Sequence, residues 1–299
     1  MDGVSFHIQE GETLGVVGES GCGKSTLGRM LIGLIDATSG QIFYDGSDIT
    51  HASNDDRRML RKEMQIIFQD PFSSLDPRMT VSETISEPLI IYKQYHTKNE
   101  LNSRVSEIMN TVGLSERLKD SYPHELDGGR RQRIGIGRAL ALKPKFIVCD
   151  EPVSALDVSI QAQILNLMQD LQDQHGLTYL FITHDLSVVK HVSTNILVMY
   201  LGCMVELCSS KLLFKHQYHP YTKGLISSIP VPDIHLAHDP ILMKGELTSP
   251  INPQPGCRFA SRCPYAKSIC FSEDPDFREV EKDHYVACHF VEEINDLHP

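Results

Sequence analysis

The sequence predicts an α/β fold in which a mostly parallel β-sheet is covered by helices. Short apolar runs at 13–17, 146–149 and 177–182 have the length and composition of buried strands. Apolar residues at helical spacing follow the first two of these runs. A strand, a helix and a second strand in this order favour parallel pairing with a right-handed crossover, which places helices on the faces of the sheet.

The first expected strand, 13–17, leads through glycine-rich sequence into a helix. Apolar side chains then recur at the spacing of one helix face, at Leu27, Met30, Leu31 and Leu34. We also interpret the segment VSFHI, residues 4–8, as a strand near the N-terminus. The chain thus begins with strand, loop and helix.

The second expected strand, 146–149, precedes a long helix. One face of that helix is marked by Ile160, Ile164, Leu167, Met168 and Leu171. The chain returns as a strand at 177–182, and 196–201 adds another. These elements complete the expected sheet.

Changes in sequence texture divide the chain into three parts. Residues 1–70 and 127–210 carry the strand and helix pattern and form the expected α/β core. Residues 71–126 are mixed and polar, with helical spacing but no strong strand signal, and we interpret them as an inserted helical subdomain. Its helical positions are Val105, Ile108, Met109 and Val112. Residues 211–299 are rich in proline and histidine and predict an appended, loop-rich extension.

Composition excludes several classes of function. The 299 residues carry a formal net charge of −11, which repels polyanions, so we expect no nucleic-acid partner and no broad anionic-lipid footprint. The N-terminus lacks a basic segment followed by an apolar run, and the most apolar later stretch, 196–205, is too short to span a bilayer. We therefore expect a cytosolic protein without a membrane span of its own.

Residues 18–26 read GESGCGKST and satisfy the phosphate-loop pattern G-x-x-x-x-G-K-[ST]. The glycines let backbone N–H groups curl around phosphate, the lysine reaches the β/γ oxygens, and the serine ligates Mg²⁺. The candidate contacts to ATP and Mg²⁺ are Gly18, Ser20, Gly21, Cys22, Gly23, Lys24, Ser25 and Thr26. The alternative is a glycine-rich turn that contains Lys and Ser by chance, and the expected strand and helix on either side make it rarer.

Asp150 and Glu151 stand at the carboxyl end of a buried strand, where ligands gather in open α/β sheets. Asp150 suits a Mg²⁺ site, and Glu151 suits activation of an attacking water. Taken alone, such a pair is as well explained by helix capping or solvation. Other motifs in the chain favour the functional interpretation.

Those motifs follow one another along the chain. Gln69 lies in FQDPFSSLDPRMTV, residues 126–138 read LDGGRRQRIGIGR, residues 154–157 read SALD, and His184 follows a strand. With the phosphate loop and the acidic strand, this set resembles the ATP-binding subunits of ABC transporters, over nearly the whole chain. The segments VGESGCGKSTLGR, CDEPVSALDVSIQAQILNLM and YLGCMVEL are similar to the oligopeptide/dipeptide importer branch, which also includes some nickel importers.

The resemblance implies a P-loop NTPase of the ABC type that pairs head to tail with a second ATPase subunit. Two ATP molecules then lie between the phosphate loop of one subunit and the signature of the other. Closure and hydrolysis drive two integral membrane permease subunits, which are fed indirectly by an extracytoplasmic solute-binding protein. The expected location is peripheral, on the cytoplasmic face of the cell membrane.

The resemblance also implies roles for individual residues. Glu151 polarises water, His184 contacts the γ-phosphate, and Gln69 senses the metal and the permease contact. The implied Mg²⁺ ligands are Ser25, Gln69 and Asp150, and the signature contacts to the partner's nucleotide are Asp127, Gly128 and Gly129, with Asp157 bridging the dimer. Two simpler interpretations stay open, because Asp157 precedes a helix and suits an N-cap, and a lone histidine after a strand is usually a core residue.

The sequence departs from the usual signature LSGGQ, because Asp127 replaces the serine and Arg130 replaces the glutamine. Two like charges about 4 Å apart repel by roughly 4 kcal/mol at an effective dielectric near 20, which is enough to impair one composite site. Asp at a helix start is also a good cap. We expect an asymmetric heterodimer with a consensus partner, and the alternative is a nucleotide-binding regulatory subunit.

A second departure is that only seventeen residues precede Gly18. The family has an earlier strand and an aromatic residue that stacks on adenine in this region. Phe6 and His7 do not match the position of that aromatic residue, so we assign none. The N-terminal strand of the family is expected to be missing.

Four of the eight cysteines gather in the extension, at Cys257, Cys263, Cys270 and Cys288. Four thiolates in so short a stretch are able to surround one metal centre, and similar importer ATPases include some with a [4Fe–4S] cluster in this region. Three interpretations stay open: an iron–sulfur cluster, a zinc ion and unmetallated structural thiols. The spacing does not match the paired CxxC of a zinc ribbon, and a disulfide is unattractive in the cytosol.

Overall fold

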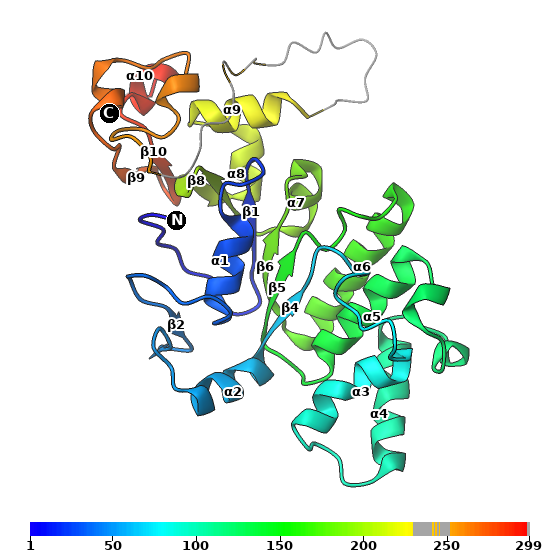
Figure 1. The fold of residues 1–299 in the computed structure, drawn as a ribbon. Helices are drawn as coiled ribbons and strands as arrows, with labels where there is room; N and C mark the ends of the chain where they lie inside the picture. Colours follow the sequence, from blue (N-terminus) through cyan, green and yellow to red (C-terminus); the bar gives the residue numbers. More distant parts are fainter. Residues whose placement is uncertain (230–240, 242, 244, 246–251, 298–299) are drawn as a thin grey trace. The chain divides into compact units, whose positions relative to one another are not determined.

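The chain divides into two compact units, and a computed structural model describes them over residues 1–229, 241, 243, 245 and 252–297. The middle unit comprises residues 9–11 and 28–182, and the terminal unit comprises residues 1–8, 12–27 and 183–299. The border between them runs through helix α1 (Lys24–Leu31). Figure 1 shows the elements of both units.

The middle unit contains three parallel strands in the order β4, β5, β6 (Met64–Ile67, Phe146–Asp150, Thr178–Ile182). β5 and β6 are fully buried apolar runs apart from Asp150 and Thr178, as expected for strands covered on both faces. Helix α6 (Val158–His175) connects β5 to β6 and buries Ile164, Leu165, Met168 and Leu171. Its first residue follows Asp157, and Gly176 ends it in the left-handed conformation.

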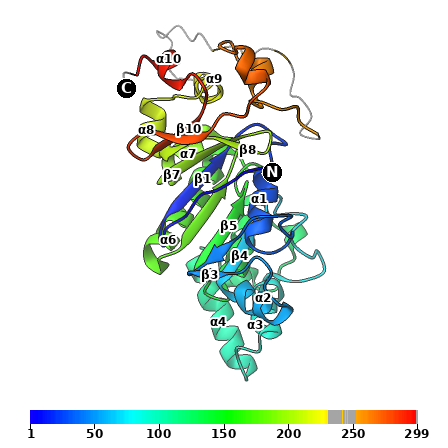
Figure 2. The same ribbon diagram turned by 90° about the vertical axis from the view of Figure 1, so that its left-hand side faces the viewer.

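Helices α3 (Val81–Ile91), α4 (Lys98–Thr111) and α5 (Gly128–Leu140) pack together in the middle unit. α3 and α4 lie side by side in both views (Figure 1, Figure 2). Thr80 and Thr97 start α3 and α4 with capping boxes, each completed by a glutamate three residues on. The short helices η1 (Glu116–Leu118) and η2 (Pro123–Glu125) lead into α5, and residues 71–126 contain helices but no strand.

The remaining elements of the middle unit are a small hairpin and a helix. Strands β2 (Phe43–Tyr44) and β3 (Ser47–Asp48) pair antiparallel, and Asn54–Glu63 forms helix α2. Ser53 caps α2 by accepting a hydrogen bond from the Asp56 amide.

The terminal unit is built on strand β1 (Thr13–Val17), which pairs in parallel with β7 (Asn195–Tyr200). β8 (Cys203–Ser209) then pairs antiparallel with β7, and β10 (His284–Ala287) pairs antiparallel with β8 and with β9 (Phe277–Glu281). The helices of this unit are α7 (Leu186–Val192), α8 (Ser210–Lys215), α9 (Pro220–Ser227), η3 (Ala260–Arg262), η4 (Ser268–Phe271) and α10 (Val291–Asn295).

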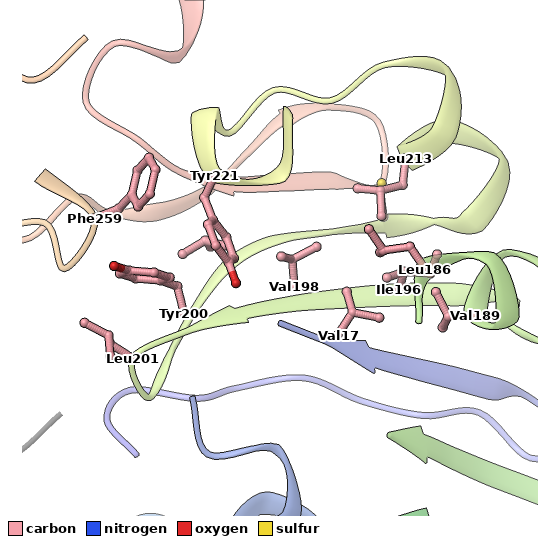
Figure 3. Packing of buried hydrophobic residues seen from close by; sticks show 12 residues of the cluster. Val17, Leu186, Val189, Ile196, Val198, Tyr200, Leu201, Leu213, Tyr221 and Phe259 are labelled. Carbon is pink, nitrogen blue, oxygen red and sulfur yellow. The ribbon is translucent and has the colours of Figure 1, made fainter. Parts of the chain in front are cut away.

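A hydrophobic core joins β1, β7, β8, α7, α8 and α9 of the terminal unit with Phe259 (Figure 3). Val17 and Val198 come from the parallel pair, Val189 from α7, and Tyr221 and Phe259 from the C-terminal extension, and each is at most 1% exposed. The extension therefore shares a core with the strand that leads into the phosphate loop. Burial of large aromatic side chains on this scale contributes roughly 2–3 kcal/mol each.

The structure confirms the predicted α/β fold and the strands at 13–17, 146–149, 177–182 and 196–201 within one residue at each end. The predicted strand at 4–8 is wrong, because these residues, all within the described part of the chain, pair with no strand. Val4, Phe6 and Ile8 are half-buried, so their apolar character reflects packing without a ladder.

Two further details differ from expectation. Leu34 is 52% exposed and lies beyond α1, because Gly33 ends that helix in the left-handed conformation. The Leu34 amide donates to the Arg29 carbonyl at 2.9 Å, and the Gly33 amide donates to the Met30 carbonyl at 3.0 Å. These two hydrogen bonds form the Schellman motif. The extension was predicted to be rich in loops, and this prediction did not include strands β9 and β10 or helix α10.

Candidate nucleotide site

The phosphate loop, residues 18–26, lies in the terminal unit and runs from the end of β1 into the first turn of α1. Gly18 has φ +153°, and a Cβ atom there would lie 2.1 Å from the Met199 carbonyl oxygen. Gly23 has φ +103°, a conformation that residues with a side chain rarely adopt. Two of the pattern's fixed glycines are therefore required by the backbone path of the loop.

Lys24 is 6% exposed, and its side chain folds back over the loop. Its Nζ donates to the Gly18 carbonyl at 2.7 Å and to the Glu19 carbonyl at 3.1 Å. The loop therefore holds a buried ammonium group through carbonyl oxygens. Phosphate oxygens can replace these carbonyls as hydrogen-bond acceptors. The amide of Leu27 donates to the Gly23 carbonyl at 2.9 Å, so the helix begins within the loop and its dipole favours an anion there.

The acidic pair lies in the middle unit at the end of β5. The Asp150 side chain is 3% exposed, and its Oδ2 lies 3.8 Å from Arg29 Nη2 on α1. A buried carboxylate needs such a cation, or a metal, to offset the loss of water. Sequence reasoning missed Arg29, although it stands five residues after the phosphate-loop lysine, in the last turn of the helix.

Glu151 follows Asp150 in a left-handed backbone conformation, with φ +49°. Its amide donates to the Ile182 carbonyl at 2.9 Å, which ties it to the end of β6. Gln69 Nε2 donates to Glu151 Oε2 at 2.8 Å, so the middle unit brings together two predicted site residues that are 82 positions apart. Strained backbone of this kind is common where a side chain must be aimed at a reacting group.

His184 is exposed, follows β6 and belongs to the terminal unit, as does the phosphate loop. The preceding Thr183 donates from its amide to the Val16 carbonyl at 3.2 Å, so the chain before His184 runs beside β1. His184 is therefore not the buried core histidine that the simpler interpretation required. Gln69, Asp150 and Glu151 belong to the middle unit.

The signature residues form the start of α5. Asp127 is the N-cap, and its Oδ1 accepts a hydrogen bond from the Arg130 amide at 2.8 Å. Its Oδ2 also lies 3.5 Å from Arg130 Nε, so a cation offsets part of the negative charge. A Cβ atom at Gly129 would lie 2.6 Å from Ile160 Cγ2, which explains a glycine where the signature packs against α6.

Asp157 is the N-cap of α6, as the simpler interpretation of this residue expected. Its Oδ1 accepts hydrogen bonds from the Ile160 amide at 3.1 Å and from the Ser159 hydroxyl at 2.8 Å. These bonds, that of the Ile160 amide most of all, lower the pKa of the Asp157 carboxyl. Capping occupies one carboxylate oxygen and leaves the second on an exposed side chain.

Cys257, Cys263, Cys270 and Cys288 all lie in the terminal unit as free thiols. The Cys257 amide donates to the Cys270 carbonyl at 2.8 Å. Burial raises the pKa of Cys257 to about 12, and the other three thiols add to the shift. Across the described residues, however, no three His, Cys, Asp or Glu side chains are arranged to hold a metal ion.

Comparison with protein families identifies two regions. Residues 1–154 match the ABC transporter family, and residues 205–270 match the oligopeptide/dipeptide transporter C-terminal region. This chain belongs to the ABC transporter family. The membership makes it an ABC-type ATPase, whose ligands are ATP and Mg²⁺.

Individual relatives agree with this assignment. The putative oligopeptide transport ATP-binding protein YkfD of Bacillus subtilis is 53% identical, over 97% of this chain and 88% of the relative. The oligopeptide transport ATP-binding protein OppF of Escherichia coli is 51% identical, over 96% of this chain and 86% of the relative.

Solved structures show the same fold. CbiO1 of Clostridium perfringens, part of an ABC transporter complex, superposes with a TM-score of 0.66 at 30% identity, over 72% of this chain and 84% of that chain. The ATP-binding cassette MJ0796, bound to ADP and Pi, superposes with a TM-score of 0.59 at 31% identity, over 65% and 83%. Among the described residues, no helix is long and apolar enough to cross a membrane.

Proposed function

We propose that this ABC ATPase hydrolyses ATP to power the import of oligopeptides or dipeptides. The observation that carries the substrate class is the match of residues 205–270 to the oligopeptide/dipeptide transporter C-terminal region. Relatives of about half identical sequence are named as oligopeptide transport ATP-binding proteins, and they extend over nearly the whole chain. An importer of nickel or another small solute is the alternative within the same mechanism.

In this proposal, the phosphate loop binds the triphosphate through its backbone N–H groups. Lys24 exchanges its hydrogen bonds to the carbonyls of Gly18 and Glu19 for bonds to the β- and γ-phosphate oxygens. Ser25, Gln69 and Asp150 are the residues proposed to hold Mg²⁺, and Arg29 helps to hold the Asp150 carboxylate in place. Bound Mg²⁺ supplies charge neutralisation for the transferring phosphoryl group.

Glu151 is the proposed base that polarises the attacking water, and Gln69 orients it. The hydrogen bond from Gln69 orients the Glu151 carboxylate, which is the proposed acceptor of a proton from water. His184 is exposed and able to contact the γ-phosphate. Removal of any one of these groups is expected to slow turnover more than it weakens ATP binding.

We propose that the working unit is a heterodimer with a second ABC ATPase of consensus signature, bound to two membrane permease subunits on their cytoplasmic face. An extracytoplasmic solute-binding protein delivers the peptide. The carboxylate of Asp127 repels the partner's γ-phosphate, which makes the site completed by this chain's signature the weaker one. The same residue favours the alternative of a regulatory subunit that binds nucleotide without turning it over.

The test is to co-purify the chain with its membrane partners and to measure ATPase activity with and without peptide. We expect peptide to stimulate hydrolysis and Glu151→Gln to retain ATP without turnover. Stimulation by nickel instead of peptide contradicts the substrate class. If Glu151→Gln itself hydrolyses ATP at the normal rate, the base assignment fails. If the whole complex keeps its wild-type ATPase rate when it contains this variant, the regulatory alternative is supported.

We further propose that the four cysteines of the extension hold a [4Fe–4S] cluster. The support for this donor set is four free thiols within the terminal unit, with the Cys257 amide donating a hydrogen bond to the Cys270 carbonyl. A cluster here would be structural or regulatory, since no catalytic residue lies among the four. Anaerobic purification with iron, sulfide and zinc analysis decides between cluster, zinc ion and bare thiols.

A further inference from the structure

A buried ion pair connects the C-terminal extension to the phosphate loop within the terminal unit. Arg262 ends the short helix η3, next to Cys263, and Glu19 is the second residue of the phosphate loop. Arg262 Nη1 lies 2.7 Å from Glu19 Oε2, and Nη2 lies 3.1 Å from Oε1. The contact is therefore bidentate, the geometry in which guanidinium and carboxylate interact most strongly.

Both partners of this ion pair are largely shielded from water. The side chains of Arg262 and Glu19 are 8% and 19% exposed, so solvent screens their attraction less than on an open surface. The hydrogen bonds with Glu19, together with a weaker one to the Tyr200 hydroxyl, raise the pKa of the Arg262 guanidinium. The pair is built into the fold and is not an incidental surface contact.

A second contact holds the backbone of the same loop residue. The Glu19 amide donates to the Tyr221 hydroxyl at 2.8 Å. Tyr221, on α9, packs edge to face on Tyr200 at 4.7 Å between ring centroids, and Phe259 packs on both rings (Figure 3). Glu19 is thus held at its carboxylate by η3 and at its N–H by α9, and both elements belong to the extension.

Glu19 in turn touches the residue that is expected to bind phosphate. Its carbonyl oxygen accepts a hydrogen bond from Lys24 Nζ at 3.1 Å, and Gly18 precedes it in the chain. A displacement of Glu19 therefore moves the loop backbone and one of the two carbonyls that hold the lysine. Misplacement of a binding group by about 1 Å is enough to change affinity or rate markedly.

We propose that Arg262 and Tyr221 are positioning residues of the nucleotide site, through which the C-terminal extension braces the phosphate loop. They hold Glu19, and with it the loop backbone and one of the carbonyls that hold Lys24, in place before ATP arrives. The proposal rests on the proposed ATP-binding role of the loop. It makes the extension part of the ATPase machinery as well as a feature of the peptide-importer branch.

The test compares Arg262→Gln with Arg258→Gln in the full chain. Arg258 is a matched control from the same segment, because its guanidinium pairs with Asp2 at 2.8 Å and not with the loop. We expect Arg262→Gln to raise the Kd for Mg-ATP about tenfold, as for the loss of one strong charged contact, with a smaller change in kcat. Arg258→Gln is expected to change the Kd less than about twofold.

A double-mutant cycle separates positioning from general stability. If Arg262 acts through Glu19, then Glu19→Gln weakens ATP binding similarly, and the double variant is no worse than either single one. Additive losses contradict the proposal. Thermal unfolding of each variant is measured in parallel, and Tyr221→Phe, which removes only the hydroxyl that Glu19 binds, decides the question if Arg262→Gln does not fold.

The outcomes distinguish this inference from the proposed function. Wild-type protein that fails to bind Mg-ATP contradicts the role of the loop itself. If the wild type binds Mg-ATP and folded Arg262→Gln or Tyr221→Phe binds it with unchanged affinity, the positioning role of the extension is refuted. The ATP-binding role of the loop then still stands. Weakened binding in both variants, with Arg258→Gln normal, supports it.

Discussion

Gln69 Nε2 donates a hydrogen bond of 2.8 Å to Glu151 Oε2, within one compact unit of the chain. The two residues come from different strand ends, since Gln69 follows β4 and Glu151 follows β5, and these strands are parallel neighbours. The carboxyl ends of parallel neighbours meet at the same edge of a sheet. The sheet topology therefore turns two distant motifs into one candidate catalytic pair.

Gln69→Ala removes the donor that orients Glu151. We expect kcat for ATP hydrolysis to fall by roughly 10–100-fold, since a misdirected base loses the benefit of its alignment, while the Kd for ATP changes less than about threefold. Steady-state kinetics and nucleotide titration measure the two effects. Gln65→Ala is the control, because Gln65 lies in the strand that precedes Gln69 and donates to the Arg61 carbonyl, away from Glu151. A similar loss of kcat in both variants contradicts the assignment.

Gly18→Ala and Gly21→Ala differ in what the added methyl group meets. At Gly18 it would lie 2.1 Å from the Met199 carbonyl oxygen, whereas nothing lies within 4 Å at Gly21. We expect Gly18→Ala to lower the free energy of unfolding by more than about 2 kcal/mol. Gly21→Ala should lose only about 1 kcal/mol, from its left-handed backbone. Urea denaturation of both variants is the measurement, and equal losses would show that the close approach at Gly18 is relieved at no cost.

Asp127→Ser restores the hydroxyl of the usual signature. Serine caps helices as well as aspartate does, so we expect the free energy of unfolding to change by less than about 0.5 kcal/mol, while Asp127→Ala loses about 1 kcal/mol. ATPase activity with a consensus partner should rise in Asp127→Ser because a charge that repels the partner's γ-phosphate is gone. An unchanged rate and unchanged nucleotide occupancy would contradict the idea of an impaired site.

The sequence allowed prediction of those features that depend on local pattern. The buried strands, the glycine-dependent loop and the caps at Asp127 and Asp157 follow from neighbouring residues alone, and the structure agrees with each. The end of α1 is also encoded locally, because Gly33 marks it. The apolar periodicity nevertheless led us to extend the expected helix to Leu34, which is one residue beyond that glycine.

The contacts that sequence reasoning missed join residues far apart in the chain. Arg29 meets Asp150, and Arg262 meets Glu19 across 243 positions. No local period encodes such pairs, since each residue taken alone looks like an ordinary exposed charge. Burial was the missing information: the Arg262 side chain is only 8% exposed, which a lone arginine in a loop-rich extension does not predict.

His219 makes the C-terminal extension sensitive to acid. It is 1% exposed and caps α9, the helix that carries Tyr221, by accepting a hydrogen bond from the Tyr221 amide at 3.1 Å. Burial lowers the pKa of His219 to about 4, although the Glu206 carboxylate opposes the shift. Protonation is therefore easier in the unfolded chain than in the folded one.

The sign of the pH dependence follows from this difference. Above pH 6.5 the imidazole is neutral in both states and contributes nothing, and as the pH falls from 6.5 to about 4 the unfolded state binds the proton first. We expect His219 to remove up to about 3 kcal/mol of unfolding free energy over that interval. His219→Asn keeps a capping side chain and should flatten the dependence of the unfolding free energy on pH. The same substitution at His216, which is exposed, should leave that dependence unchanged. Denaturation at several pH values measures this, and parallel profiles for wild type and His219→Asn would refute it.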